Sequence, residues 1–303
     1  MADRTVAAYR AGAAVARALP GPVVDGLATV AGLTMGNIDR TRRAQVERNL
    51  RRICGPELGG RAMRRAVAAT FDSYAHYWAE TFRLPGTSTA EIDARFSTDG
   101  WPLVEDAFER GNGVIMGVAH LGGWEWAAAW SAKVKGVPVS AVVEAIEPPE
   151  LFEWFVELRR ELGINVIPLD RNAGGAVARA LKANHLLCLV CDRDISRGGV
   201  EVDFFGERTS FPAGPATLAL RTGAPLLPTA IFFRGRDHEG VLRPPVPAVR
   251  EGRLRDDVAR VSQLLATELE GLIRLAPEQW HVMQPNWPSD PGYASAREDA
   301  ALP

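Results

Sequence analysis

The stretch GVIMGVAHLGGWEWAAAW, residues 113–130, contains two side chains whose types and spacing could do chemistry, His120 and Glu125. The apolar run that ends on His120 predicts a buried strand, and the Ala- and Trp-rich run after it predicts a helix. Gly122 and Gly123 allow a sharp turn between these two elements. We therefore expect His120 at the end of a strand and Glu125 in the first turn of the next helix, close enough for its carboxylate to contact the imidazole.

A histidine that is oriented by a carboxylate is suited to general-base catalysis near neutral pH. The carboxylate fixes the tautomer of the ring and stabilises the imidazolium that forms. The sequence has no G-x-S-x-G, no G-x-x-x-x-G-K-[ST] and no H-E-x-x-H motif. The pattern therefore favours direct transfer, in which a substrate hydroxyl attacks an activated acyl group. Backbone N–H groups of the glycine turn and nearby Arg side chains are candidates for stabilising the oxyanion.

The alternative interpretation is structural, with Glu125 as a favourable charge at a helix N-terminus and His120 as a strand-end residue. Three further carboxylates favour a functional site. Asp192 and Asp194 follow the apolar run HLLCLVC, and Glu144 follows VPVSAVV. Because sites in α/β sheets form at the carboxyl ends of the strands, we expect these side chains on the same edge as His120.

From about residue 84 onward, strand-like apolar runs alternate with helix-like segments. This alternation predicts an α/β fold with a mixed, mostly parallel central sheet flanked by helices. The expected strands are residues 111–120, 137–143, 164–169, 185–191 and 225–233, with 198–205 as an edge strand or ribbon. The expected helices are residues 124–134, 149–162, 173–183, 213–222 and 255–276.

The chain is expected to form one structural domain with three parts. Residues 1–83 are predicted to be helical, basic and membrane-facing, residues 84–290 to form the α/β core, and residues 291–303 to be a loosely ordered tail. The N-terminal helices are expected at residues 5–19, 22–33, 39–54 and 60–84, separated by Pro and Gly.

The N-terminal part is basic although the net charge of the whole chain is only −2. Residues 1–65 carry twelve Arg and no Lys against five Asp and Glu, a balance of +7. Such an end suits a membrane surface or an anionic ligand, the alternative being a solvated helix face, and no nucleic-acid partner is expected. The first helix places Arg10 and Arg17 on one face, and an apolar face that could lie on a membrane contains Val6, Tyr9, Ala13 and Ala16. No apolar stretch there reaches the ~20 residues that span a bilayer.

The cysteines are expected to be apolar packing residues and not metal ligands. Cys188 and Cys191 form CLVC inside an apolar strand, and no second Cys pair follows, so no metal site is expected. A small, odd number of cysteines suits a reducing cytosol.

Several motifs resemble a known family. HLGGWE is similar to the H-x4-D/E motif of glycerolipid-type acyltransferases. Together with LFEWFVELRRELGINVIPL, CDRDISRGGVEVDFFGERTSFPAGPATLALRTGAPLLPT and PEQWHVMQPNWPSD, it resembles the bacterial lipid A lauroyl-type acyltransferase superfamily. Within that superfamily the chain is most similar to the phosphatidylinositol mannoside acyltransferases of actinobacteria, and the similarity runs from RRAQVERNL to NWPSD.

The resemblance implies a glycerolipid acyltransferase-like fold and a peripheral enzyme at the cytoplasmic face of the plasma (inner) membrane. The enzyme would move a fatty acyl group, typically palmitoyl, from acyl-CoA to a mannose hydroxyl of a phosphatidyl-myo-inositol mannoside. Acyl-CoA is then a co-substrate, and neither a cofactor nor a metal is expected. Lipid A enzymes usually carry an N-terminal transmembrane anchor, and the lack of one in this sequence favours the mannoside branch.

The resemblance also implies roles for individual residues. The expected catalytic residues are His120 as the base, Glu125 as its orienting acid, where Asp is commoner, and Asp194 as a carboxylate near the base. The expected substrate-binding residues are Glu144, Arg159, Asp192, Arg193, Arg208 and Ser210. Trp124, Trp126 and Trp130 are expected in the core or a groove wall, and His281 is expected to be structural.

Three other functions remain open on the sequence. The acceptor could be another glycolipid, such as a lipid A-type molecule, or water could replace it, which would make the protein a thioesterase. A non-catalytic membrane lipid-binding protein is the third alternative, and the combination of His120 and Glu125 argues against it.

Overall fold

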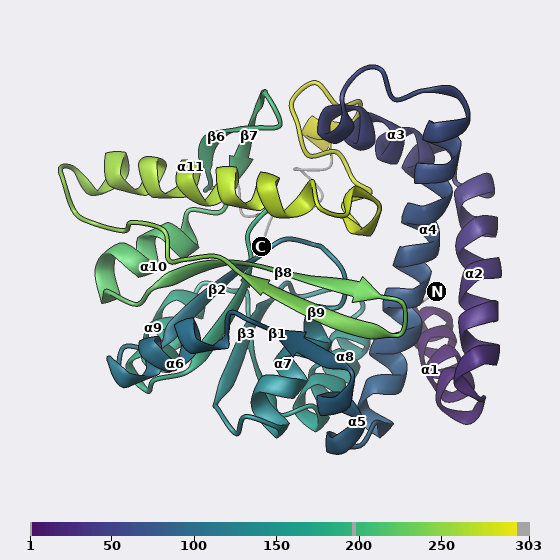
Figure 1. The fold of residues 1–303 in the computed structure, drawn as a ribbon, viewed down its shortest axis with the longest axis horizontal. Coiled ribbons are helices and arrows are strands. Elements are labelled where there is room, and N and C mark those ends of the chain that lie inside the picture. The colour runs from purple at the N-terminus through teal and green to yellow at the C-terminus, as the bar shows by residue number, and fades with distance from the viewer. Residues whose placement is uncertain (1, 196–197, 296–303) are drawn as a thin grey trace.

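The structure, a computed structural model, describes residues 2–195 and 198–295 and is built around a seven-stranded sheet (Figure 1). The strand order is β1-β9-β8-β2-β5-β3-β4; β8 and β9 are antiparallel, and the other neighbouring pairs are parallel. The strands are β1 (Phe96–Thr98), β2 (Val114–Val118), β3 (Val139–Val143), β4 (Ile164–Pro168), β5 (Leu186–Val190), β8 (Leu226–Arg234) and β9 (Asp237–Leu242). The predicted mixed, mostly parallel α/β sheet is confirmed.

Helices cover both faces of this sheet. On one face lie α5 (Thr89–Ala94), α6 (Trp101–Glu109), α7 (Trp124–Lys133) and α8 (Pro149–Glu161). On the other lie α9 (Ala173–Lys182), α10 (Gly214–Thr222) and α11 (Leu254–Ile273). Alternate residues of β2 enter the two cores, Ile115 on the α11 side and Met116 on the α7 side. Because both faces are covered, the strands read as continuous apolar runs in the sequence.

A short antiparallel ribbon stands apart from the sheet. It pairs β6 (Val200–Phe204) with β7 (Glu207–Phe211) beside α11, as the ribbon interpretation of residues 198–205 predicted. Strands β1 and β9 were not predicted. β1 has three residues and β9 is the polar-rich DHEGVL, so neither shows an apolar run.

The predicted helical N-terminal region is also confirmed. It contains α1 (Ala2–Ala18), α2 (Gly21–Ile38), α3 (Arg40–Cys54) and α4 (Gly60–Arg83). The first two helices lie against α4 at one side of the molecule (Figure 1). No helix of the described ranges is long and apolar enough to cross a membrane. Of the expected loosely ordered tail, residues 296–303 lie outside the described residues.

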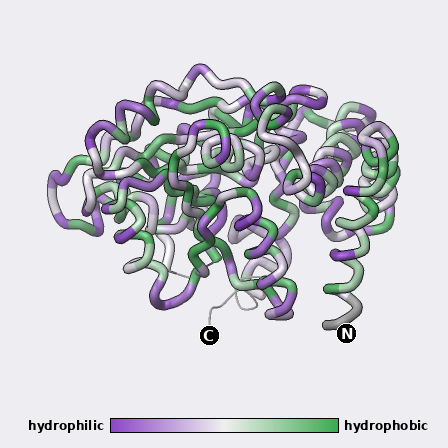
Figure 2. Tube along the Cα trace, turned by 90° about the horizontal axis from the view of Figure 1, so that it is seen from below, coloured by the Kyte–Doolittle hydropathy of each residue, from purple (hydrophilic) through white to green (hydrophobic). Residues whose placement is uncertain are grey.

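The apolar face of α1 packs inside the protein, which contradicts the expectation that it lies on a membrane. Val6, Ala13 and Ala16 are buried, and the Tyr9 ring contacts Trp78 of α4 and Phe155 of α8 edge-on. Large exposed apolar side chains instead gather on α2, at Val23, Leu27, Val30, Leu33 and Ile38. Figure 2 shows the corresponding pattern, with hydrophobic stretches in the centre of the molecule and mixed hydropathy along the N-terminal helices.

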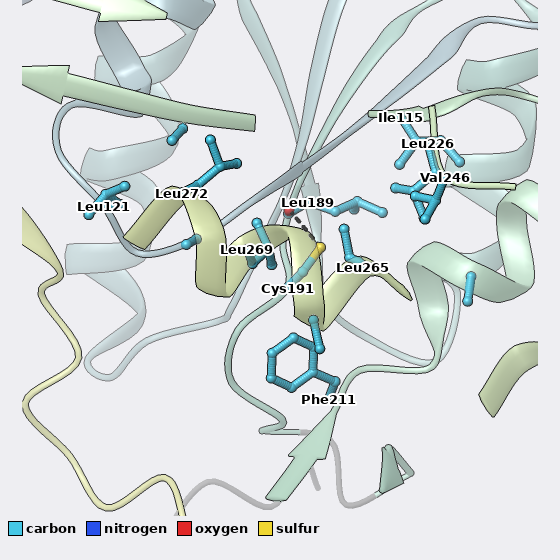
Figure 3. Close-up of a cluster of buried hydrophobic side chains, with 14 of the residues drawn as sticks. Ile115, Leu121, Leu189, Cys191, Phe211, Leu226, Val246, Leu265, Leu269 and Leu272 are labelled. Atoms are coloured by element: carbon cyan, nitrogen blue, oxygen red, sulfur yellow. Dashed lines mark hydrogen bonds between the residues drawn. The ribbon is translucent and has the colours of Figure 1, made fainter. Parts of the chain in front are cut away.

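The two strand cysteines are packing residues, as their apolar context predicted. Cys191 lies among Leu189, Leu265, Leu269 and Phe211 on the α11 side of the sheet (Figure 3), and its thiol donates to the Leu189 carbonyl at 3.1 Å. Cys188 lies in the core on the α7 side of the sheet, and burial raises the pKa of its thiol to about 12.

Gly122 allows the turn between β2 and α7. Its φ is +60°, and a Cβ atom at this position would overlap the carbonyl oxygen of Ile231 in β8. Gly136 has a similar φ of +68° but nothing within 4 Å of an added Cβ atom. Substitution of Gly136 therefore tests only the energetic cost of a positive φ in a residue with a Cβ atom, whereas substitution of Gly122 adds the cost of the steric overlap with Ile231.

We expect Gly136→Ala to cost about 1–2 kcal/mol, the cost of a left-handed backbone for a residue with a Cβ. Gly122→Ala should cost more and should also displace His120, because the backbone of the turn must move away from β8. Thermal denaturation of the two variants measures this difference. Equal losses would contradict the role given to the close contact with Ile231.

Candidate active site

His120 and Asp192 form the centre of the site. They follow β2 and β5, which are neighbours in the sheet with Val118 paired to Val190, so each lies two residues beyond a matched strand end. The Nδ1 atom of His120 lies 2.7 Å from Asp192 Oδ1, and the His120 backbone N–H donates to Asp192 Oδ2 at 2.9 Å. With Nδ1–H donating to the carboxylate, Nε2 is left as the proton acceptor on a ring whose side chain is 44 % exposed.

Asp192 is fully buried and accepts several hydrogen bonds. The indole N–H of Trp280 donates to Asp192 Oδ2 at 2.6 Å, and the side-chain amide of Asn286 donates to the Asp192 carbonyl at 2.9 Å. Burial raises the pKa of the Asp192 carboxyl, but the positive charge of protonated His120 and the hydrogen bonds from His120 and Trp280 outweigh it, so the pKa lies below its usual value. The group is therefore ionised at neutral pH, as a partner of an imidazolium must be.

The predicted contact between Glu125 and His120 is wrong. The Glu125 carboxylate is buried, and its Oε1 atom accepts from Arg159 at 3.0 Å and from the hydroxyl of Tyr77 at 3.1 Å. Its Oε2 atom is buried and has no hydrogen-bond partner among the residues that the structure describes. Burial raises the pKa of Glu125, with Arg159 acting against this effect. Glu125 thus ties α7 to α4 and α8, because the first turn of α7 directs it toward those helices.

Asp194 and two of the expected substrate-binding residues belong to the ribbon and its loop. Asp194 Oδ2 accepts from Ser210 Oγ at 2.8 Å and from the Gly199 backbone N–H at 3.2 Å, which joins the loop after β5 to β7. Arg208 is 70 % exposed and pairs with Glu201 and Asp203 on the ribbon surface. The expected catalytic role of Asp194 stays a prediction.

A cavity of about 700 Å³ opens beside His120. Of the six residues predicted to bind substrate, Glu144, Arg159 and Arg193 line it, whereas Asp192, Arg208 and Ser210 are not among the described residues of its wall. The remaining wall is largely apolar and includes Trp78, Trp124, Val142, Ile146, Phe152, Phe155, Leu169, Val177, Leu189, Ile195 and Leu218. Trp124 is therefore a groove-wall residue, whereas Trp126 and Trp130 are buried in the core, and both positions agree with the expectation from the sequence.

His281 packs behind His120 and stays neutral. Its backbone N–H donates to the His120 carbonyl at 2.7 Å, and its Nε2 atom lies 2.9 Å from Ser73 Oγ. Burial, and to a smaller extent the charge of His120, lowers the pKa of His281 to about 3. His281 supports the backbone at His120, in agreement with its expected structural role.

A second cavity, of about 930 Å³, lies across α4, and many charged side chains are among the residues that line it. Neither His120 nor Asp192 lines it. The buried His238 near it bonds Glu80 at 2.8 Å and stacks on Trp126 at 4.3 Å between ring centroids. The contacts of His238 with Glu80 and Trp126 stabilise the start of α7. Because His120 lines the first cavity and not the second, the first cavity is the candidate active site.

An imidazole held by a buried carboxylate at the carboxyl edge of the sheet, beside a largely apolar cavity, defines a site that can activate a hydroxyl next to an aliphatic substrate. The chain belongs to the bacterial lipid A biosynthesis acyltransferase family, whose sequence profile matches residues 3–289. It is accordingly an acyltransferase that acts on a glycolipid.

Two relatives are both named phosphatidylinositol mannoside acyltransferase. That of Mycolicibacterium smegmatis is 36% identical over 249 residues, which is 81% of this chain and 80% of the relative. That of Mycobacterium tuberculosis is 35% identical over 229 residues, which is 74% of this chain and 71% of the relative. The family resemblance seen in the sequence motifs is confirmed.

Several residues of the site were not predicted from the sequence. Tyr77 lies in an amphipathic helix, where an aromatic residue usually signals packing. Trp280 and Asn286 lie in PEQWHVMQPNWPSD, which has no strand or helix periodicity to indicate what its polar groups face. The sequence signal that could have indicated them is the combination of aromatic and amide side chains in this one segment. The structure shows that most of these side chains are buried.

The two acidic residues should respond differently to removal of their charge. Asp192→Asn should lower acyl transfer by roughly 10²- to 10⁴-fold, because an amide neither fixes the tautomer nor stabilises the imidazolium. Glu125→Gln should mainly lower stability, by up to about 3–5 kcal/mol, because it leaves Arg159 buried without its counter-charge. Initial rates and thermal denaturation of both variants check this. A folded but inactive Glu125→Gln protein beside an active Asp192→Asn protein would restore the original assignment.

Proposed function

We propose that the protein transfers a fatty acyl group, palmitoyl in the first instance, from acyl-CoA to a mannose hydroxyl of a phosphatidylinositol mannoside, with His120 as general base. The observation that carries the proposal is that His120, hydrogen-bonded to the buried Asp192, lines a largely apolar cavity. The names of the two mycobacterial relatives support the choice of acceptor.

In the proposed reaction His120 Nε2 takes the proton of the acceptor hydroxyl as its oxygen attacks the thioester carbonyl carbon. The new C–O bond forms while the carbonyl electrons move to the oxygen, and Asp192 stabilises the imidazolium. The tetrahedral intermediate then collapses, the C–S bond breaks, and the CoA thiolate takes the proton from Nε2. The base is regenerated, so no other proton acceptor is needed.

Cations for the donor and the oxyanion are available on the cavity wall. Arg193, next to Asp192, and Arg221 of α10 both line the cavity, and guanidinium groups suit the phosphates of CoA or a developing oxyanion. Gly122, one of the backbone donors expected from the sequence, already donates to the Gln279 carbonyl at 3.1 Å. We therefore assign oxyanion stabilisation to Arg193 in preference to this amide.

The apolar wall suits the acyl chain, and Glu144 suits the sugar. Burial of a chain contributes about 0.8 kcal/mol for each CH₂ group, which favours a long aliphatic substrate over a short one. Glu144, which follows β3 at the same sheet edge and lines the cavity, can accept hydrogen bonds from mannose hydroxyls.

His120→Ala should lower transfer of palmitoyl from palmitoyl-CoA to phosphatidylinositol mannoside by ~100-fold or more, as loss of a general base usually does. His76→Ala is a matched control, because His76 lies on α4 outside the cavity beside His120. Product formation by mass spectrometry measures both. Full activity of a folded His120→Ala protein would disprove the proposed base.

The same assay separates the other functions. A panel with a lipid A-type acceptor in place of the mannoside identifies the acceptor, and CoA release without an acceptor measures thioester hydrolysis. Lipid binding with neither transfer nor hydrolysis would indicate a non-catalytic protein.

We further propose that the protein is peripheral on the cytoplasmic face of the plasma membrane and binds through α2 and the basic N-terminal surface. The exposed Val23, Leu27 and Val30 recur at helical spacing on α2 and can enter the interface, while Arg side chains of the neighbouring helices favour anionic lipid.

Val30→Glu should weaken binding to vesicles that contain anionic lipid, since it places a charge on the apolar face of α2. Val249→Glu is the matched control, because Val249 is exposed to the same degree, 60 % against 63 %, in the segment after β9. Vesicle co-sedimentation measures both. Equal binding of the two variants would exclude α2 as the contact.

A further inference from the structure

The C-terminal segment from Pro277 to Asp290 lies along the turn that carries the base. Trp280 forms a β-bridge with Leu121, and the Gln279 carbonyl accepts from Gly122 at 3.1 Å. The backbone N–H of His281 donates to the carbonyl of His120 at 2.7 Å. The main chain of this segment thus fixes the backbone of the residue that carries the imidazole.

The same segment also holds the partner of the base. Trp280 is buried, and its indole N–H points to Asp192 Oδ2 at 2.6 Å, while Asn286 donates to the Asp192 carbonyl. Oδ2 therefore receives two N–H groups, from Trp280 and from the His120 backbone, and Oδ1 is left for the imidazole. This division fixes the rotation of the carboxylate about its Cβ–Cγ bond.

The segment is anchored at its far end, so Trp280 has little freedom to follow a moving carboxylate. Asp290 is buried and accepts from the backbone N–H groups of Asn286 and Trp287 at 2.9 and 3.1 Å. It also pairs with Arg52 at 2.8 Å and accepts from Gln45 at 2.8 Å, both on α3.

We propose that Trp280 is a positioning residue of the active site, whose indole N–H holds Asp192 in the one orientation that directs His120 Nε2 to the cavity. The inference rests on the proposed role of His120. Loss of this N–H leaves the buried Asp192 carboxylate with one hydrogen-bond donor fewer. Its negative charge then interacts more strongly with the imidazole, and the carboxylate is free to rotate about its Cβ–Cγ bond. Both effects alter the base without touching the substrate.

Trp287 provides a matched control in the same segment. It is also buried, its ring centroid lies 6.0 Å from that of Trp280, and its indole N–H donates at 3.2 Å to the backbone carbonyl of Phe204. Replacing either tryptophan by Phe removes an indole N–H and part of a buried ring, but Trp280→Phe alone takes a donor from Asp192.

Trp280→Phe should lower kcat by roughly 10- to 100-fold with little change in KM, because misplacement of a catalytic group has effects of this size. The acidic limb of its pH–rate profile should move to higher pH, since an Asp192 with fewer donors stabilises the imidazolium more. Trp287→Phe should lower the thermal midpoint but leave the acidic limb unmoved. Equal kinetic losses, or an acidic limb that does not rise in Trp280→Phe, would overturn the proposal.

Two further measurements test the role of Trp280 with less disturbance of the fold and without any acceptor substrate. Site-specific incorporation of 3-benzothienylalanine at position 280 or 287 replaces the indole N–H by sulfur in a ring of nearly the same shape. NMR titration of the His120 imidazole should then show an upward shift for position 280 and none for position 287, with no substrate present. An inactive wild type with this NMR shift would refute the proposed function alone, and an active wild type without it would refute the role of Trp280 alone.

Discussion

The hydrogen bond between His120 Nδ1 and Asp192 Oδ1 joins the ends of two neighbouring parallel strands, and the rest of the site is arranged around it. β2 and β5 pair in register up to Val118 and Val190, and the two side chains each lie two residues further on. Their separation is therefore set by the strand spacing of a sheet packed on both faces. A site held this way has a more precise geometry than one built on surface loops.

Two buried carboxylates near the cavity have different tasks because their surroundings differ. The Asp192 carboxylate faces the His120 imidazole and two further N–H donors, and its charge can stabilise a proton on that ring. Glu125 faces the fixed positive charge of Arg159 and the hydroxyl of Tyr77. It joins three helices that wall the cavity, since it lies on α7 while its partners come from α8 and α4.

The sequence was sufficient to predict the sheet and the edge at which polar residues meet, because both follow from apolar runs that end on His120, Glu144 and Asp192. The sequence could not predict which strands pair in the sheet, because β2 pairs with β5 and β8, which lie more than 60 residues further along the chain. Glu125 was preferred as the orienting acid because it is near His120 in sequence. The direction of a side chain in the first helical turn depends on packing against α4 and α8, which no local pattern encodes.

The indole that contacts Asp192 lies 88 residues beyond it in the chain, near the end of the described structure. Ribosomal synthesis therefore delivers β2, β5 and the other strands of the sheet before it delivers Trp280. A nascent polypeptide can bury its apolar strands while Asp192 still lacks the segment that covers it. The strands of the sheet are thus synthesised before the segment that holds Asp192, and in the proposed mechanism His120 gains its oriented partner only after residues 277–290 have been made.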